Sequence, residues 1–164
     1  FPLLDFLRET AHGGISEAVE GHRLRSAARM ARRAEPSDDP YDGDLVLARA
    51  TLDRLEGLVR ERGLEVFARI DHAAGAARIG RHLRPTELLI FGSPQGGTPF
   101  MECSQTVGID LPLKALAWED EAGRTWLGYT DPDFLARRHG VPDCPAVANL
   151  RRALAGLVEA AAAP

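Results

Sequence analysis

The stretch GLEVFARIDHAAGAARIGRHLRPTELLIFGSPQGGTPFMECSQTVGIDLPLKALAW, residues 63–118, decides the fold class of this chain. It contains two runs with the composition of β-strands, residues 64–70 and 87–91. Asp71 and His72 follow the first run, and a glycine-rich segment, residues 92–98, follows the second. Functional side chains are often held at strand ends. We therefore expect a site built from these two segments.

Around the two strands the sequence predicts helices and a further strand pair. A helix at residues 45–62 precedes the first strand, a strand pair is expected at residues 112–129, and a helix at residues 131–140 comes after it. Shorter helices are expected at residues 72–83 and 100–107, and a final helix at residues 145–163. About four strands grouped between helices indicate an α+β domain with a mainly antiparallel sheet covered on one face.

The composition is that of a soluble globular protein of one domain. The chain has 164 residues, of which 45% are hydrophobic and 27% charged, with a formal net charge of -4. No apolar run approaches the roughly 20 residues that span a bilayer, and the negative charge disfavours nucleic acid as a partner. We expect a cytoplasmic protein without membrane or nucleic-acid partners. The chain begins at Phe1 without an initiator methionine, so a segment upstream is expected, and its first residues do not have the pattern of a secretory leader.

The predicted organisation has three parts. Residues 1–44 form an N-terminal helical arm and linker, residues 45–141 form the domain, and residues 142–164 form a C-terminal helix packed on that domain. Within the arm, residues 23–33 contain five arginines and no acid. Such a patch either grips phosphate or an acidic partner, or is a solvated helix face. We predict the solvated face.

Two cysteines, Cys103 and Cys144, lie 41 positions apart without the spacing of a zinc site. Two unpaired thiols suit a reducing cytosol, and a single disulfide is the alternative. Met101, Cys103 and His72 also form a soft donor set for copper or haem, although their spacing fixes no geometry. Met101 is more readily explained as a core residue.

Several short motifs occur in a characteristic order: IDHAAGA (70–76), LRPTEL (83–88), FGSP (91–94), GTPFM (97–101), DLPLK (110–114), WED (118–120) and Tyr129. In this order they resemble the family called domain of unknown function 302, over residues 51–141. The resemblance implies a two-layer domain of the TATA-binding-protein-like class, in which a curved antiparallel sheet packs on helices. It implies no assigned activity, so no catalytic residue is transferred. The N-terminal arm and the final helix are interpreted as additions to the family's domain, and Ser93 stands where asparagine is common.

His72 and Lys114 are the predicted catalytic residues. An imidazole near neutral pH can take and give a proton, although Asp71 points to the opposite face of a strand and would not pair with it. Lys114 is the only lysine among 20 basic residues, which marks a position where arginine does not substitute. We predict that both face one cavity. The alternatives are a capping histidine and a surface lysine.

The segment 92–98 is predicted to cradle an anion with its amides and the Thr98 hydroxyl, or to be only a tight turn. Trp118 and Tyr129 are expected to pack across a strand pair. The predicted ligand-binding residues are Asp71, Gly92, Ser93, Gln95, Gly97, Thr98 and Tyr129, with no metal ligand.

The function preferred on these grounds is a small-molecule-binding domain or an enzyme that acts on a small anionic ligand. The first alternative is a non-catalytic, homodimeric interaction domain, in which the arm and the final helix make the contacts. The second is a haem- or metal-binding protein. No cofactor is expected for the preferred function, and a homodimer is expected.

Overall fold

The computed structural model describes residues 42–163, so the predictions for the N-terminal arm and its arginines lie outside the described residues. The described elements, in chain order, are α2 Asp42–Glu61, β1 Glu65–Asp71, α3 His72–Arg78, β2 Thr86–Gly92, α4 Pro94–Cys103, the 3-10 helix η2 Gln105–Ile109, β3 Leu113–Glu119, β4 Thr125–Tyr129, α5 Pro132–Arg138 and α6 Ala146–Ala162.

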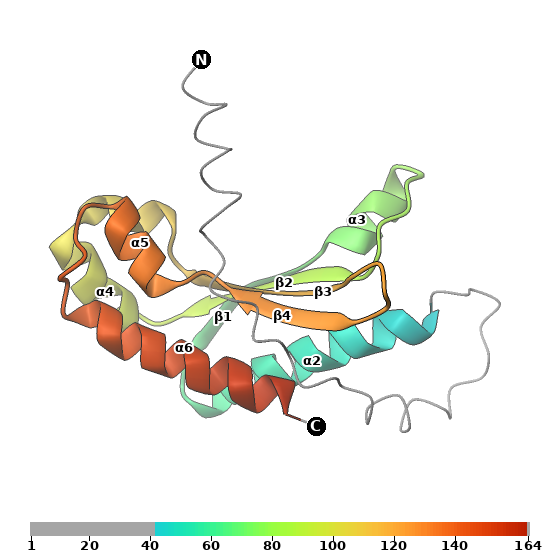
Figure 1. Ribbon diagram of the computed structural model, residues 1–164, viewed down its shortest axis with the longest axis horizontal. Helices are drawn as coiled ribbons and strands as arrows, with labels where there is room; N and C mark the ends of the chain where they lie inside the picture. The colour runs from blue at the N-terminus through green and yellow to red at the C-terminus, as the bar shows by residue number, and fades with distance from the viewer. Residues whose placement is uncertain (1–41, 164) are drawn as a thin grey trace, which may run out of the picture.

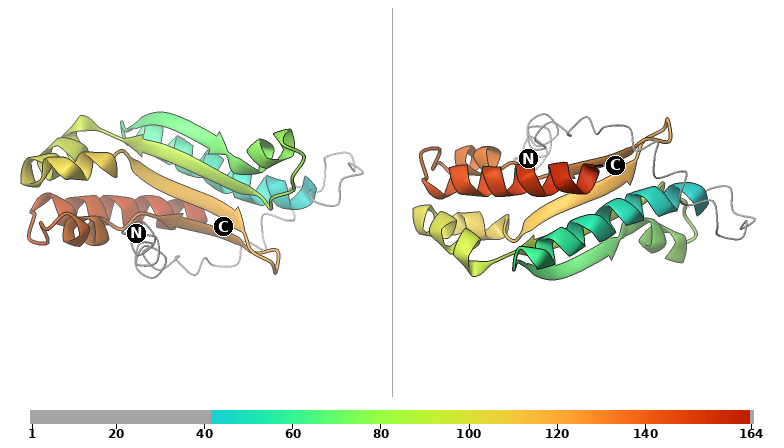
Figure 2. Two further views of the ribbon diagram at one scale, coloured as in Figure 1. Left: turned by 90° about the horizontal axis from the view of Figure 1, so that it is seen from above. Right: turned by 90° about the horizontal axis from the view of Figure 1, so that it is seen from below.

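The four strands form one antiparallel sheet in the order β1-β2-β3-β4 (Figure 1). The predicted neighbourhood of residues 64–70 and 87–91 is confirmed, because β1 pairs with β2 along its length. The predicted α+β class is confirmed as well. Long helices α2 and α6 lie side by side across one face of the sheet, as the view from below shows (Figure 2).

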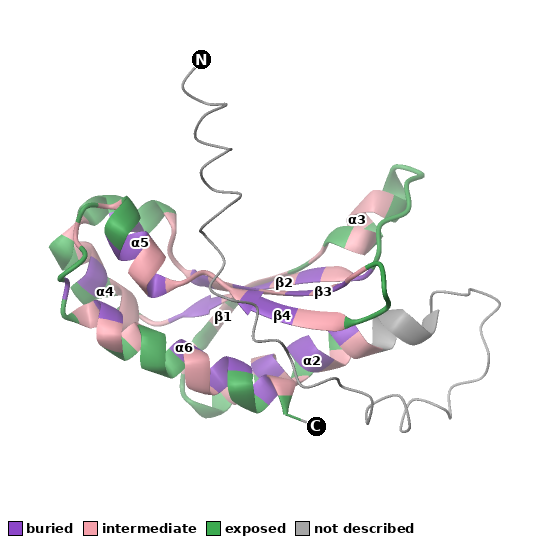
Figure 3. Ribbon diagram, in the orientation of Figure 1, coloured by how far each residue is buried: buried purple, intermediate pink, exposed green. Residues whose placement is uncertain are grey.

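The core lies between these two helices and the sheet (Figure 3). In α2, Leu52, Leu55 and Val59 recur at helical spacing and are fully buried. In β3, buried Leu113, Ala115 and Ala117 alternate with half-buried residues, which is the period of a strand. The remaining buried members of this cluster are Ala48, Leu89, Phe91, Leu127, Leu154, Leu157, Val158 and Ala161.

A second, smaller core holds α4, η2, α5 and the start of α6 together at one end of the sheet. Its buried members are Phe100, Val107, Leu135, Ala136, Cys144 and Val147. This cluster matters for the site because it fixes α4 beside α6.

The start of α4 differs from the sequence-based prediction. A helix was expected from residue 100, but α4 already begins at Pro94. Ser93 is its N-cap and accepts a hydrogen bond from the backbone N–H of Gly96, while Pro94 occupies the first turn. The glycine-rich segment is therefore mostly helix, because the cap and the proline outweigh the low helix propensity of its glycines.

Candidate functional site

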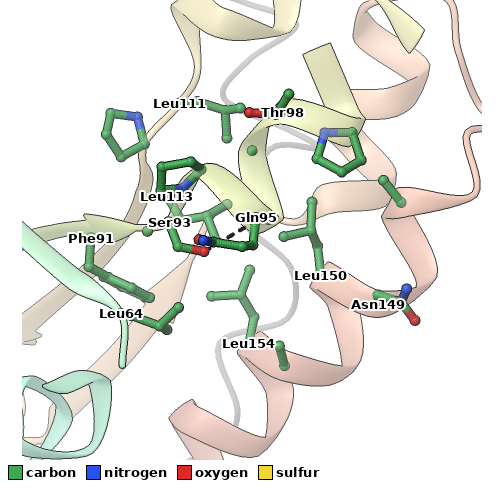
Figure 4. A pocket seen from close by; sticks show the side chains of 18 of the residues that line it. Leu64, Phe91, Ser93, Gln95, Thr98, Leu111, Leu113, Asn149, Leu150 and Leu154 are labelled. Carbon is green, nitrogen blue, oxygen red and sulfur yellow. Dashed lines mark hydrogen bonds between the residues drawn. The ribbon is translucent and has the colours of Figure 1, made fainter. Parts of the chain in front are cut away.

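A cavity of about 470 Å³ lies between α4, α6 and the adjoining ends of the sheet (Figure 4). Leu64 and Phe91 contribute to its wall from the sheet side, and Leu150 and Leu154 from α6. Further apolar lining comes from Leu111 and Leu113, on the approach to β3 and in it. The close view shows Leu64, Leu150 and Leu154 in the space below the start of α4 (Figure 4).

The rim of this cavity contains five of the predicted ligand-binding residues. Gly92, Ser93, Gln95, Gly97 and Thr98 all line it. The structure thus brings the whole segment to a single cavity, together with Asn149 of α6, which is exposed and whose amide oxygen accepts a hydrogen bond from Arg152. These polar groups are neutral, and none of the described lining residues carries a formal charge.

The backbone amides at the start of α4 are largely used within the helix. Ser93 accepts hydrogen bonds from Gly96 N, through both its Oγ at 3.2 Å and its carbonyl at 3.1 Å, and from Gly97 N at 2.9 Å. Pro94 has no N–H to offer. The segment therefore offers an anion few of the amides that a phosphate-type cradle requires.

Glycines allow α4 to approach its neighbours closely. A Cβ on Gly97 would lie 3.5 Å from Leu111, and one on Gly108 would lie 3.3 Å from the sulfur of Met101. Met101 itself lines the cavity and packs against the second core, in agreement with the interpretation of it as a core residue.

A disulfide joins Cys103, the last residue of α4, to Cys144, which precedes α6. The preferred interpretation of two unpaired thiols is wrong, and the alternative of one disulfide holds. The bond ties together the two helices that enclose the cavity. It also removes Cys103 from the soft donor set, and the described residues contain no cluster of three or more metal-ligating His, Cys, Asp or Glu side chains.

His72 and Asp71 lie at the opposite end of the sheet from the cavity. Asp71 pairs with Glu87 near the start of β2, whereas the glycine-rich segment follows the end of β2. Asp71 caps α3 by accepting from Ala74 N at 2.8 Å, and it also accepts from Arg49. His72 is exposed as the first residue of α3.

Charged side chains at that end of the sheet are paired with each other. Glu87, only 3% exposed, accepts hydrogen bonds from Arg49 and from Arg69. Burial acts to lower the pKa of Arg69, but its bonds to Asp53 and Glu87 outweigh this and raise the pKa above its ordinary value. The cluster fastens α2 to β1 and β2.

Lys114 projects from the face of the sheet opposite the cavity. Its neighbour Leu113 lines the cavity, and successive strand residues point to opposite faces. The ammonium donates to the carbonyl oxygens of Asp110 and Pro112, each at 2.8 Å, and burial lowers its pKa. Neither Lys114 nor His72 lines this cavity, so it does not bring the two predicted catalytic residues together. The expected packing of Trp118 with Tyr129 is wrong, because Trp118 is opposite Trp126, whereas Tyr129 is half-buried at the end of β4 and packs against the main core.

Sequence reasoning missed the contribution of α6 to the cavity. The only local signal was that its apolar stripe includes Leu150, which the structure places at the cavity rather than in the centre of the core. It also missed an array in which His139 contacts Asp110 at 2.6 Å and Thr106 at 2.8 Å. This array lies outside the cavity and links η2 to the end of α5.

The family model named "Domain of unknown function DUF302" matches residues 47–161. The matched region includes α6, so the final helix is part of the family's domain and not an addition to it. A crystal structure of an uncharacterized conserved protein DUF302 from Bacillus stearothermophilus shares the fold, with a TM-score of 0.63 and 22% identity over 70% of this chain and 90% of that one.

Curated relatives are called fluoride-specific ion channels. FluC 1 of Brucella suis biovar 1 (strain 1330) is 42% identical over 121 residues, which is 70% of this chain and 48% of that protein. FluC 2 of Brucella melitensis biotype 1 is also 42% identical, over 45% of its length. The chain thus spans about half the length of the curated relatives it matches. Among residues 42–163, no helix has both the length and the hydropathy needed to cross a membrane.

Proposed function

We propose that this chain, which belongs to the DUF302 family, is a small-molecule-binding domain whose ligand is an apolar, uncharged molecule held between α4 and α6. The observation that carries the proposal is the cavity of about 470 Å³ with its leucine-rich wall and neutral amides at the rim. Its volume is within the range of about 300–1,000 Å³ typical of small-molecule sites. We propose binding and assign no reaction.

The character of the lining argues against the anionic ligand expected from the sequence. An anion taken into an apolar cavity needs a cation or several free N–H donors to offset its loss of hydration. The described lining residues carry no charge, and the amides of Gly96 and Gly97 are bonded to Ser93. The amide of Gln95, at the rim, can instead hold a neutral polar group of a largely apolar ligand.

A thermal-shift comparison of matched ligands tests this proposal on the full chain. Decanol and decanoate have the same chain length and differ in the charge of the head group. Because binding to the native state raises its stability, decanol should raise the melting temperature more than decanoate does. A rise with decanoate alone would contradict the proposal, as would no rise with any alcohol of six to twelve carbons.

The name of the curated relatives supports a second proposal. A domain that matches half of a protein called a fluoride channel can act as a ligand-responsive part that accompanies the channel. The cavity supports that role rather than fluoride binding, because fluoride is strongly hydrated and this lining offers it no cation. Sodium fluoride should therefore stabilise the chain no more than sodium chloride at equal ionic strength. A rise specific to fluoride would assign a fluoride site to this domain.

The cytoplasmic location stays a prediction. The Cys103–Cys144 disulfide favours an oxidising compartment instead, because cytosolic thiols are usually kept reduced. Titration of free thiols in protein isolated under alkylating conditions would decide which holds. The disulfide also removes Cys103 from the donor set on which the haem- or metal-binding alternative was based.

A further inference from the structure

One face of the sheet carries a continuous set of apolar side chains, and apart from α3 at one end no described element lies over it (Figure 1). We call it the open face. Its side chains point away from α2 and α6, since they alternate with those of the core. Its apolar members are Ala68, Ile70, Leu88, Ile90, Leu116, Trp118 and Trp126.

Strand register places these residues in adjoining rows. Ile70 is opposite Leu88, and Leu88 is opposite Leu116, which gives one apolar row across three strands. The next row ends in Trp118 and Trp126, whose rings are stacked with centroids 6.3 Å apart. Ile70 is 39% exposed, and the other large side chains are half-buried by their own neighbours. A contiguous apolar patch of this kind marks an interaction surface.

Charge on the open face is confined to its margins. The ammonium of Lys114 is turned toward the carbonyl groups of Asp110 and Pro112, at the end of the sheet that borders η2. At the opposite end, the Arg124 guanidinium lies 5.3 Å from the centre of the Trp126 ring and is paired with Asp120. An apolar centre with a polar rim is the usual anatomy of a protein–protein interface.

We propose that a second copy of this chain covers the open face, so that two sheets pack face to face about a two-fold axis. Such a pairing needs a patch that complements itself, and an apolar patch whose marginal charges are neutralised within each copy does so. Sheets pack stably face to face when their apolar surfaces interdigitate. The pairing is independent of the cavity, which lies on the helical side of the sheet.

The open face is small compared with the interfaces of permanent dimers. Strands about 4.8 Å apart with about 3.3 Å per residue give the face a footprint of roughly 400 Å². Two copies then bury roughly 800 Å², below the 1,200 Å² or more of standard permanent interfaces. We therefore expect a weak dimer, whose dissociation constant depends on the quality of the contact and not on this area alone. An anionic lipid surface is a poorer occupant, because among the described residues the rows of this face present only one cation, that of Lys114, and Arg124 at the margin is already paired with Asp120.

Both tryptophans of the chain lie on the open face, so intrinsic fluorescence reports directly on its covering. The full chain should be followed by sedimentation and by tryptophan emission over a dilution from about 100 µM to about 0.1 µM. We expect dimers at high concentration and monomers at low concentration. Over the same range the emission should shift to longer wavelength and acrylamide quenching should increase as Trp118 and Trp126 become solvated.

Two variants with a matched control locate the contact. Leu116→Glu places a charge in the centre of the open face. Ile70→Glu places a charge on the outer strand β1, at a side chain that is already 39% exposed, so this variant should disturb folding less. Both should weaken the dimer at least tenfold with the circular dichroism spectrum unchanged. Ile109→Glu, at a residue of η2 that is 80% exposed, should leave the dimer intact.

Three results would overturn the proposal. The first is a monomer at every concentration, with tryptophans protected from quenching, which would mean that residues 1–41 cover the face. The second is a dimer unaffected by either face variant, which would place the contact elsewhere. The third is a monomer whose tryptophans shift to shorter wavelength only on addition of phosphatidylcholine or phosphatidylglycerol vesicles.

Discussion

Gly96 of α4 lies so close to Leu150 of α6 that a Cβ on the glycine would be 3.3 Å from the Leu150 Cδ2 atom. The backbone of α4 can therefore form one side of the cavity directly, without a side chain between the two helices. Leu150 is half-buried and contacts both hydrophobic clusters. It is thus the residue through which the cavity can be changed with least disturbance of the fully buried core.

Filling the cavity should abolish ligand binding while the fold is kept. We expect Leu150→Trp to occupy much of the space and to lower the affinity for decanol at least tenfold. The melting temperature of the unliganded chain should change by about 3 °C or less, because an indole in an existing cavity causes little overpacking. Glu159→Trp, on an exposed position of the same helix that does not line the cavity, is the matched control and should bind as the wild type does. Equal binding by both variants would place the ligand outside this cavity.

The sheet was predictable from sequence because its signal is local. Alternation in residues 113–119 shows which side chains are buried, and the composition of residues 64–70 and 87–91 marks them as strands. The same alternation predicted that Leu113 and Lys114 point to opposite faces of the sheet. It does not show which distant segment covers which face, so the position of α6 beside Leu64 required the structure.

The expected shared site failed for a reason of topology. His72 and the segment 92–98 each follow a strand, and both were assigned to one cavity. Adjacent antiparallel strands run in opposite directions, however, so the C-terminal end of one strand and that of the next lie at opposite ends of the sheet along the strand direction. The prediction of an antiparallel sheet already separated the two segments. The disulfide gave no comparable signal, because residues 41 positions apart meet only through the packing of α4 and α6.

Breaking the disulfide should loosen the cavity. The loop between Cys103 and Cys144 spans 41 positions, for which chain entropy predicts a stabilisation of about 4 kcal/mol. Urea unfolding of the variant C103S/C144S should show a loss of this size, and decanol should bind it more weakly because α4 is no longer tied to α6. Reduction of the wild type should reproduce both effects. Unchanged stability in the reduced protein would mean that the smaller hydrophobic cluster alone holds α4.

The β3–β4 turn should show a defined acid dependence through Asp120. Its carboxylate accepts from the Trp126 indole at 2.8 Å and from the backbone N–H groups of Arg124 and Ala122, and these bonds lower its pKa well below the ordinary range. Because the folded pKa lies below the unfolded value of about 4, the contribution is fully present above that pH and is lost as the pH falls further.

Asp120→Asn should therefore be less stable than the wild type at pH 7, and the difference should shrink as the pH is lowered below about 4. Thermal unfolding followed by tryptophan emission measures both effects, since Trp126 reports on the turn itself. Glu121→Gln is the neighbouring control, with a side chain that is 89% exposed, and should have no such effect. A difference that stays constant across the acid range would assign the effect to shape and not to charge.

Replacement of Lys114 distinguishes a lysine of the ligand site from a lysine outside it. Its ammonium donates to the carbonyl oxygens of Asp110 and Pro112 on the far side of the sheet from the cavity. Lys114→Arg should thus lower the stability by about 1 kcal/mol, since the planar guanidinium cannot reproduce both short bonds. The affinity for decanol should remain that of the wild type. A folded Arg variant that had lost decanol binding would place Lys114 at the ligand site, as expected from the sequence.

The pH dependence of the same residue has a predictable sign. Burial lowers the pKa of Lys114, so between that lowered pKa and the unfolded value of about 10.4 the unfolded chain binds more protons than the folded one. Stability of the wild type relative to Lys114→Met should consequently rise with pH across this alkaline window. Unfolding should be compared at protein concentrations where both are monomers, because the residue lies on the open face. A relative stability that falls with rising pH would show that the bonds to the two carbonyl groups outweigh burial and hold the lysine protonated.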